Sequence, residues 1–173
     1  MSATDTDARR GAILFTDLVG FTAFTDAHGD RAAVDVLDRQ AVIVSAALDG
    51  RGRIVKELGD GLMVWFDSAR AGLDAARNIL GSVSAARDVA EFPLAVRMGM
   101  HVGEVVPRGD DFVGQTVNIA ARVADLAGPG ELLVTDDVVR ALDVSAPADE
   151  FRPVGPTRVK GVSAPIWLHR LTN

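Results

Sequence analysis

Short apolar runs alternate along this chain with longer stretches whose apolar residues recur every three or four positions. The first run, residues 11–19, is continuous and ends at Gly20, which predicts a buried strand followed by a turn. A helix is predicted next, with Asp30 as its N-cap and Gly50 closing it. Its predicted inward-facing residues are Val34, Leu37, Ala41, Val44 and Leu48.

The pattern then predicts a hairpin, a second helix and a third long strand. Strands over 52–57 and 62–66 are joined through an Asp-Gly turn, which is a strong hairpin signal. Ser68 is the predicted cap of a helix ending near Gly81, and residues 94–106 form the next predicted strand. The order β-α-β-β-α-β predicts a ferredoxin-like core within an α/β fold of the α+β sandwich type.

The remaining third of the chain adds helices and strands to this core. It predicts a helix over 114–127, a short strand over 131–134, a helical segment over 135–142 and closing strands over 151–160 and 165–171. At 173 residues, with no internal repeat or low-complexity linker, we expect residues 1–173 to form one domain with its core over about 11–171.

Composition narrows the possible partners and the compartment. The formal charge of −6 argues against broad nucleic-acid binding, which needs a basic surface. The polar, acidic start and the short apolar runs predict neither a leader nor a membrane anchor, and the absence of cysteine fits the cytoplasm. Sixteen arginines stand beside only two lysines, Lys56 and Lys160, which suggests that a compact point charge matters at those two positions.

Two aspartates are candidates for a metal site. Asp17 ends the first strand, and the turn after it (Gly20, Phe21, Thr22) can point backbone N–H groups at phosphate oxygens. Taken alone, Asp17 could equally cap that turn, and Asp60 is the residue that an Asp-Gly hairpin favours anyway. If the strands pair as in a ferredoxin-like sheet, both carboxylates could converge on two Mg²⁺ or Mn²⁺ ions about 3.5 to 4 Å apart.

A third polar group lies on the predicted helix over 114–127. Asn118 and Arg122 are four residues apart and therefore share one helix face, where Arg could stabilise a phosphate and Asn could hold a ribose oxygen. The alternative is an exposed polar face beside the small residues Ala120 and Ala121. His101 alternates with apolar neighbours and is better explained as a packed sheet residue than as a base.

Together, the segments 15–22, 56–61 and 111–122 resemble the signature segments of the class III adenylate and guanylate cyclases in order and spacing. The resemblance extends over about residues 11–160. It implies a nucleotidyl cyclase catalytic domain in which metal ions assist attack of a ribose hydroxyl on the α-phosphate.

The resemblance also implies a role for each position. Asp17 and Asp60 match the two metal-binding aspartates, with the Leu18 carbonyl as an additional ligand for two divalent ions. Asn118 and Arg122 match the pair that orients the ribose and stabilises charge on the α-phosphate.

Lys56 and Asp111 match the pair that reads the purine. A lysine can donate to adenine N1 and an aspartate can accept from the N6 amine, whereas guanine presents the opposite pattern, so ATP is the expected substrate. Lys160 resembles the family's lysine near the triphosphate. Glu57 departs from the family pattern by placing a carboxylate beside the purine lysine.

In the family that the chain resembles, the active site lies between two subunits. A single chain that carries every position is complementary to a copy of itself, so the resemblance implies a homodimer with two equivalent sites. The alternatives are an ATP-sensing module without catalysis, a guanylate cyclase, and a ferredoxin-like interaction domain.

Overall fold

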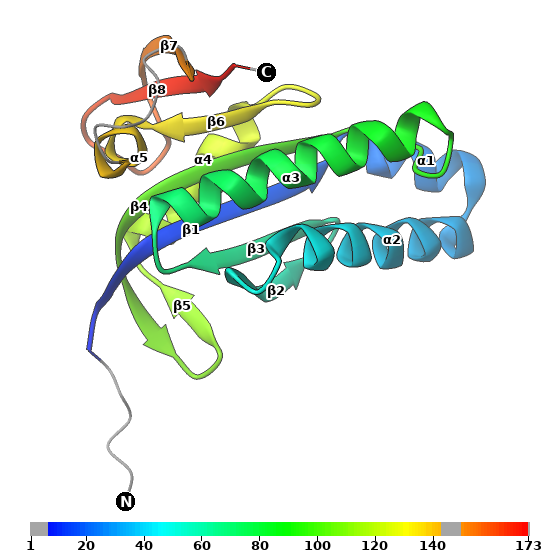
Figure 1. Ribbon diagram of the computed structural model, residues 1–173, viewed down its shortest axis with the longest axis horizontal. Helices are drawn as coiled ribbons and strands as arrows, with labels where there is room; N and C mark the ends of the chain where they lie inside the picture. Colours follow the sequence, from blue (N-terminus) through cyan, green and yellow to red (C-terminus); the bar gives the residue numbers. More distant parts are fainter. Residues whose placement is uncertain (1–6, 143–149, 173) are drawn as a thin grey trace, which may run out of the picture.

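The computed structural model describes residues 7–142 and 150–172, so residues 1–6, 143–149 and 173 of the predicted domain lie outside the described part. Within that part the chain forms eight strands and five helices (Figure 1). The strands are β1 (Arg9–Leu18), β2 (Gly52–Leu58), β3 (Gly61–Phe66), β4 (Val96–Arg108), β5 (Asp111–Val113), β6 (Leu132–Thr135), β7 (Phe151–Thr157) and β8 (Ile166–Leu171). The helices are α1 (Phe21–His28), α2 (Asp30–Leu48), α3 (Ala69–Asp88), α4 (Gln115–Leu126) and α5 (Asp136–Ala141).

The strands are arranged in the order β2-β3-β1-β4-β6-β8-β7, and β5 folds back onto β4. The first four are antiparallel, with helices joining β1 to β2 and β3 to β4. This is the predicted ferredoxin-like core. β6 then pairs parallel to β4, and β8 and β7 extend the sheet in antiparallel fashion. The mixed α+β fold with C-terminal helix and strand additions is therefore confirmed.

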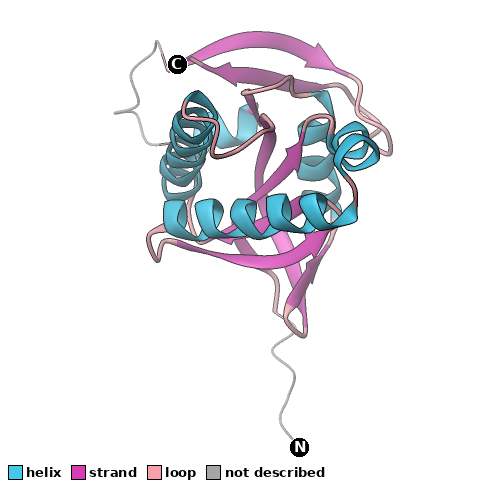
Figure 2. Cartoon of the chain, turned by 90° about the vertical axis from the view of Figure 1, so that its right-hand side faces the viewer, coloured by secondary structure: helices cyan, strands magenta, loops and turns pink. Residues whose placement is uncertain are grey.

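Helices cover both faces of the sheet, which explains why its central strands read as continuous apolar runs. Along β1, Leu14 and its alternate neighbours pack with α2 and α3, while Ile13 and Phe15 lie in a second cluster with α4. Figure 2 shows helices flanking the strands on more than one side. Strand β5 and the end of β4 project away from this layered body as a hairpin (Figure 1).

Glycines in β4 allow α4 to lie unusually close to the sheet. A Cβ at Gly99 would lie 2.1 Å from the backbone nitrogen of Ala124, and one at Gly103 would lie 2.4 Å from Thr116 Oγ1. Small residues on the facing side of the helix, Ala120 and Ala124, complete the fit. The position of α4 is thus set by the absence of side chains on β4.

The first two helices differ from the sequence prediction. Helix α1 was not predicted, because it has eight residues, no side-chain cap at Gly20 and no buried residue that would give a periodic signal. In α2, Gly29 and not Asp30 is the N-cap, and Val34 is 53% exposed. The buried stripe instead runs through Ala33, Val36, Gln40, Val44, Ala47 and Leu48.

Helix α3 does not end near Gly81 as predicted but continues to Asp88. It begins at Ser68, whose hydroxyl accepts the Ala71 N–H as expected. It ends where Ala90 takes a left-handed conformation and Glu91 N–H donates to the Ala86 carbonyl, a closure that usually uses glycine. In the described residues, no helix has the length and apolar character needed to cross a membrane.

Both edges of the sheet are irregular. Strand β2 has a bulge between Ile54 and Lys56, and β7 has one between Pro153 and Gly155. Strand β7 ends at Thr157 and is therefore shorter than the predicted strand over 151–160.

His101 lies on β4, and its side chain is buried against the end of β6 and the start of α5, as expected for a packed sheet residue. Its side chain is 9% exposed, and its Nδ1 lies 2.7 Å from Thr135 Oγ1 and 3.9 Å from an Asp137 carboxylate oxygen. Burial lowers the pKa of the ring, Asp137 opposes this shift and Arg10 adds to it.

Gly99→Ala should destabilise the domain by about 1–3 kcal/mol, because the new methyl group collides with the α4 backbone and not with a flexible side chain. Gly81→Ala is the matched control: its Cβ would meet nothing within 4 Å, so it should stabilise α3 by up to about 1 kcal/mol. Urea unfolding measures both. Equal stability of Gly99→Ala and the parent would contradict the close packing of α4.

The lowered pKa of His101 predicts a pH dependence of stability. Its contribution is fully present above 6.5, the ordinary histidine value, and is lost as the pH falls below it, because the unfolded chain then binds the proton more readily. His101→Gln should therefore flatten the decline in unfolding free energy between about pH 6.5 and 5. The exposed His28, replaced by Gln, serves as the control and should leave that decline in place.

Candidate active site

Two carboxylates meet at one end of the sheet. Asp17 is the penultimate residue of β1, and Asp60 lies in the tight turn between β2 and β3. Antiparallel pairing of β1 with β3 brings the turn beside the end of β1, and Asp60 Oδ2 accepts a hydrogen bond from the Leu18 N–H at 3.3 Å. The structure therefore places Asp17 and Asp60 side by side, and we call them the carboxylate pair.

The carboxylate pair is electrostatically unfavourable without a cation. Burial of Asp60, followed by the hydrogen bond and the charge of the neighbouring Asp17, raises the pKa of Asp60 above its ordinary value of 3.8. Backbone N–H donors of Asp60 and Leu18 oppose this shift. A positive charge placed between the two groups would therefore be stabilised.

Two residues that the sequence analysis did not identify form hydrogen bonds with the carboxylate pair. Arg97 donates from Nε to Asp17 Oδ2 at 2.8 Å and from Nη1 to the Asp125 carbonyl at 3.1 Å. Gln40, which is 2% exposed, donates to the Asp60 carbonyl at 3.1 Å. Gln40 could have been noticed in the sequence as a polar residue on the buried stripe of α2. The pairing of Arg97 with Asp17, in contrast, depends on the β1–β4 register.

The donor set fits hard divalent cations. It offers the carboxylates of Asp17 and Asp60 next to the backbone of Leu18, and oxygen donors are the ligands that Mg²⁺ and Mn²⁺ prefer. Among the described residues no group of three or more His, Cys, Asp or Glu could hold a metal, so this is no closed all-protein cage. The Arg97 guanidinium already stands in as a cation at Asp17.

The turn after β1 leads directly into α1. Gly20 adopts φ 77°, a left-handed conformation that glycine accommodates well, and Phe21 and Thr22 form the first turn of the helix. First-turn N–H groups have no acceptor within a helix and carry partial positive charge. The turn predicted to face phosphate oxygens is thus a helix N-terminus next to the carboxylate pair.

Lys56 and Asp111 form a second pair, which we call the lysine–aspartate pair. Lys56 Nζ lies 2.7 Å from Asp111 Oδ2, and the side chains are 35% and 36% exposed. The hydrogen bond from Lys56 lowers the pKa of Asp111, and the Phe112 N–H donates to its other oxygen at 2.7 Å. Two residues 55 positions apart therefore present one donor and one acceptor side by side.

Asn118, Arg122 and Lys160 lie on exposed surfaces. Asn118 and Arg122 share the outer face of α4, where Arg122 Nη1 lies 3.4 Å from an Asp125 carboxylate oxygen. Lys160 follows the end of β7. In residues 7–142 and 150–172, no direct hydrogen bond or ion pair joins these three side chains to the carboxylate pair.

Comparison with known proteins decides the family. Residues 6–172 match the model of the adenylate and guanylate cyclase catalytic domain, which is nearly the whole chain. The chain belongs to this family.

Relatives of the cyclase domain support the assignment. It is 31% identical over 166 residues to the pH-sensitive adenylate cyclase MT1302 of Mycobacterium tuberculosis, covering 95% of this chain and 41% of that protein. It is 30% identical over 147 residues to an adenylate cyclase of Streptomyces coelicolor, covering 82% of this chain and 37% of that protein. The chain thus spans less than half the length of these relatives.

Solved structures agree on the fold. An adenylate/guanylate cyclase/hydrolase from Silicibacter pomeroyi is 28% identical with a TM-score of 0.82, over 96% of this chain and 98% of that one. The adenylyl cyclase CyaB from P. aeruginosa has a TM-score of 0.83 over 98% and 97% of the two chains, at 22% identity.

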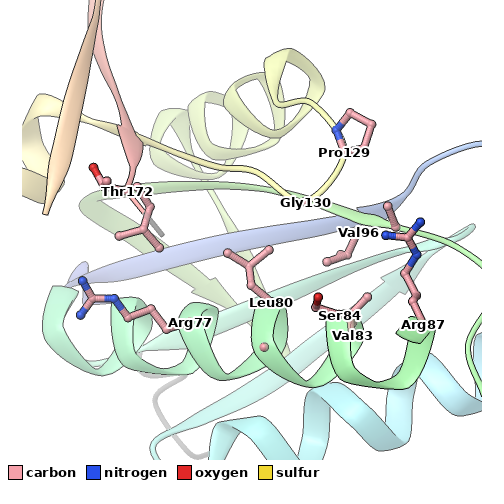
Figure 3. Close-up of a pocket in the computed structure, with 12 residues that line it drawn as sticks. Arg77, Leu80, Val83, Ser84, Arg87, Val96, Pro129, Gly130 and Thr172 are labelled. Atoms are coloured by element: carbon pink, nitrogen blue, oxygen red, sulfur yellow. The ribbon is translucent and has the colours of Figure 1, made fainter. Parts of the chain in front are cut away.

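A cavity of about 740 Å³ in the cyclase domain is lined by residues of α3, β4 and the end of β8 (Figure 3). One wall is a face of α3 with Arg77 and Arg87 towards opposite ends, and the other walls come from β4, the turn before β6 and the end of β8. None of the predicted site residues lines it. The candidate site residues and this cavity therefore have no lining residue in common.

Proposed function

We propose that this chain is an adenylate cyclase that converts ATP to 3′,5′-cyclic AMP and pyrophosphate. The observation that carries the substrate assignment is the lysine–aspartate pair, whose polar atoms lie 2.7 Å apart although Lys56 is on β2 and Asp111 is on β5. Lys56 can donate to adenine N1 while Asp111 accepts from the N6 amine, a pattern that guanine cannot match. Two relatives named adenylate cyclase support the same substrate.

The carboxylate pair would hold two divalent ions, Mg²⁺ or Mn²⁺, with the Leu18 carbonyl as a further ligand. When bound, such ions supply Lewis-acid activation of the ribose 3′-hydroxyl and neutralise the departing pyrophosphate. The first turn of α1, with Gly20, Phe21 and Thr22, would bind phosphate oxygens through its backbone N–H groups. Lys160 would add positive charge near the triphosphate.

Asn118 and Arg122 would act on the reacting groups. Asn118 orients the ribose by a hydrogen bond, and Arg122 stabilises the charge that grows on the α-phosphate in the transition state. Both side chains project from the outer face of α4. Because they lie on a solvent-facing surface of their own chain, a second molecule can approach them.

We propose that this second molecule is a copy of the same chain. A two-fold dimer would place Asn118, Arg122 and the lysine–aspartate pair of one copy opposite the carboxylate pair of the other, giving two equivalent sites. Residues 1–173 would act as one catalytic domain in the cytoplasm, where ATP is available, without nucleic-acid or membrane partners.

The purified protein should form cyclic AMP from ATP with Mg²⁺ or Mn²⁺, and cyclic GMP from GTP at least about a hundredfold less efficiently. The reason is that GTP would leave the lysine–aspartate pair without matching hydrogen bonds. Chromatographic quantification of both products tests this. Preference for GTP would identify a guanylate cyclase, and nucleotide binding without either product would identify a sensing module.

Mixing two inactive variants tests the shared site. Asp17→Ala and Arg122→Ala proteins should each be inactive, while an equimolar mixture should regain about a quarter of the parent activity, since half the dimers are mixed and each carries one intact site. Asp17→Ala mixed with Asp60→Ala is the matched control and should stay inactive, because both changes affect the same half-site. An inactive first mixture would rule out the shared site.

A further inference from the structure

We propose that Arg97 is an internal counter-cation that occupies Asp17 until a metal ion displaces it, and that this exchange couples the carboxylate pair to the α4 helix. The inference rests on the proposed function, since it takes the carboxylate pair to be the metal site. Arg97 would then be a positioning residue of the metal site.

The competition follows from the contact geometry. Arg97 places two donors on one oxygen of Asp17, Nε at 2.8 Å and Nη2 at 2.5 Å. A metal bound by that oxygen would bring a second cation within a few ångström of the guanidinium. Because Asp17 and Arg97 are only 28% and 30% exposed, water screens this repulsion incompletely.

The pairing also explains how the chain tolerates its two neighbouring carboxylates before metal binds. Asp60 is partly buried beside Asp17, and its pKa is raised in consequence. The guanidinium compensates Asp17 from the opposite side, since the register places Arg97 directly across from Asp17 on β4. Arg97 thus stabilises the metal-free form of the carboxylate pair.

The same guanidinium reaches the last turn of α4. Its Nη1 donates to the Asp125 carbonyl at 3.1 Å. This carbonyl lies in the last turn, where carbonyl groups accept no hydrogen bond from within the helix. The Asp125 carboxylate lies 3.4 Å from Arg122 Nη1 on the same helix. Three consecutive contacts therefore connect Asp17 to Arg122 through Arg97 and Asp125.

In the proposed dimer these two ends serve different active sites. Asp17 belongs to the metal half of one site, whereas Arg122 of the same chain belongs to the other site. Displacement of Arg97 by a metal at the first site would remove or redirect its bond to α4 and so alter the helix end that carries Arg122. Metal loading at one site would thereby be communicated to its twin.

Titration of the nucleotide-free protein with Mn²⁺ tests whether the ion competes with Arg97 for Asp17, and it requires no turnover. The electron paramagnetic resonance signal of the free ion measures how much Mn²⁺ has bound. Arg97→Gln should bind Mn²⁺ about tenfold more tightly than the parent, because no guanidinium has to leave Asp17. Arg97→Lys, which keeps the charge but loses the planar fork, should fall between the two. Arg170→Gln is the matched control: it removes an equal charge from a 2.9 Å pair with Glu131 and should bind as the parent does.

Hydrogen exchange tests the coupling in the unaltered protein. Mn²⁺ should change the exchange rates of amides in the last turn of α4, and this response should be absent in Arg97→Gln. The response to Mn²⁺ is measured in the unaltered protein, so it can be observed even if Arg97→Gln does not fold.

Unchanged or weaker Mn²⁺ binding by Arg97→Gln would overturn the competition, and an α4 that does not respond to Mn²⁺ would overturn the coupling. Neither result would contradict the proposed cyclase activity, which the product assay with ATP tests separately. Absence of Mn²⁺ binding in every variant would overturn this inference together with the metal role of the carboxylate pair.

Discussion

Strand β1 pairs with β3 on one side and β4 on the other, and both of its faces are buried. A shift of either pairing by one residue would exchange the side chains that pack into the two different clusters on either side of the sheet, so the packing of both clusters fixes the register. This register places Arg97 opposite Asp17 and brings the Asp60 turn against the end of the same strand. Packing of the core and the geometry of the carboxylate pair therefore have one cause.

Packing on the second face of the sheet depends on a different constraint, which is how closely α4 can approach β4. Glycine at two positions of β4 lets α4 pack at backbone distance, and its end then reaches Arg97. A helix held further from the sheet would not bring the Asp125 carbonyl within hydrogen-bonding distance of that side chain. The close packing of α4 is thus part of the electrostatic environment of Asp17.

Local chemistry made much of this fold predictable. The Asp-Gly turn, the cap at Ser68 and the period of the apolar residues were sufficient for the core order and for most elements. Features that depend on tertiary structure were not accessible: α1 buries no residue, and α3 closes through Ala90 where glycine is usual. The role of Arg97 depends on a strand partner 80 positions away, which no local pattern encodes.

The candidate site shows the same division. The residue types of the two pairs were readable from the chain, and the structure adds that each pair is assembled from segments far apart in the sequence. The bulge in β2 illustrates the point, since it changes the alternation just before Lys56, and bulges commonly redirect side chains beside active sites.

The irregular outer strand β7 has a consequence for assembly. Pro153 and Pro156 carry no N–H group, and the bulge between Pro153 and Gly155 interrupts the ladder, so this edge offers a poor template for another strand. Growth of the sheet across β7 from one molecule to the next is disfavoured. Edge-to-edge association through β7 is thereby disfavoured, which leaves the proposed two-fold dimer to form through another surface of the molecule.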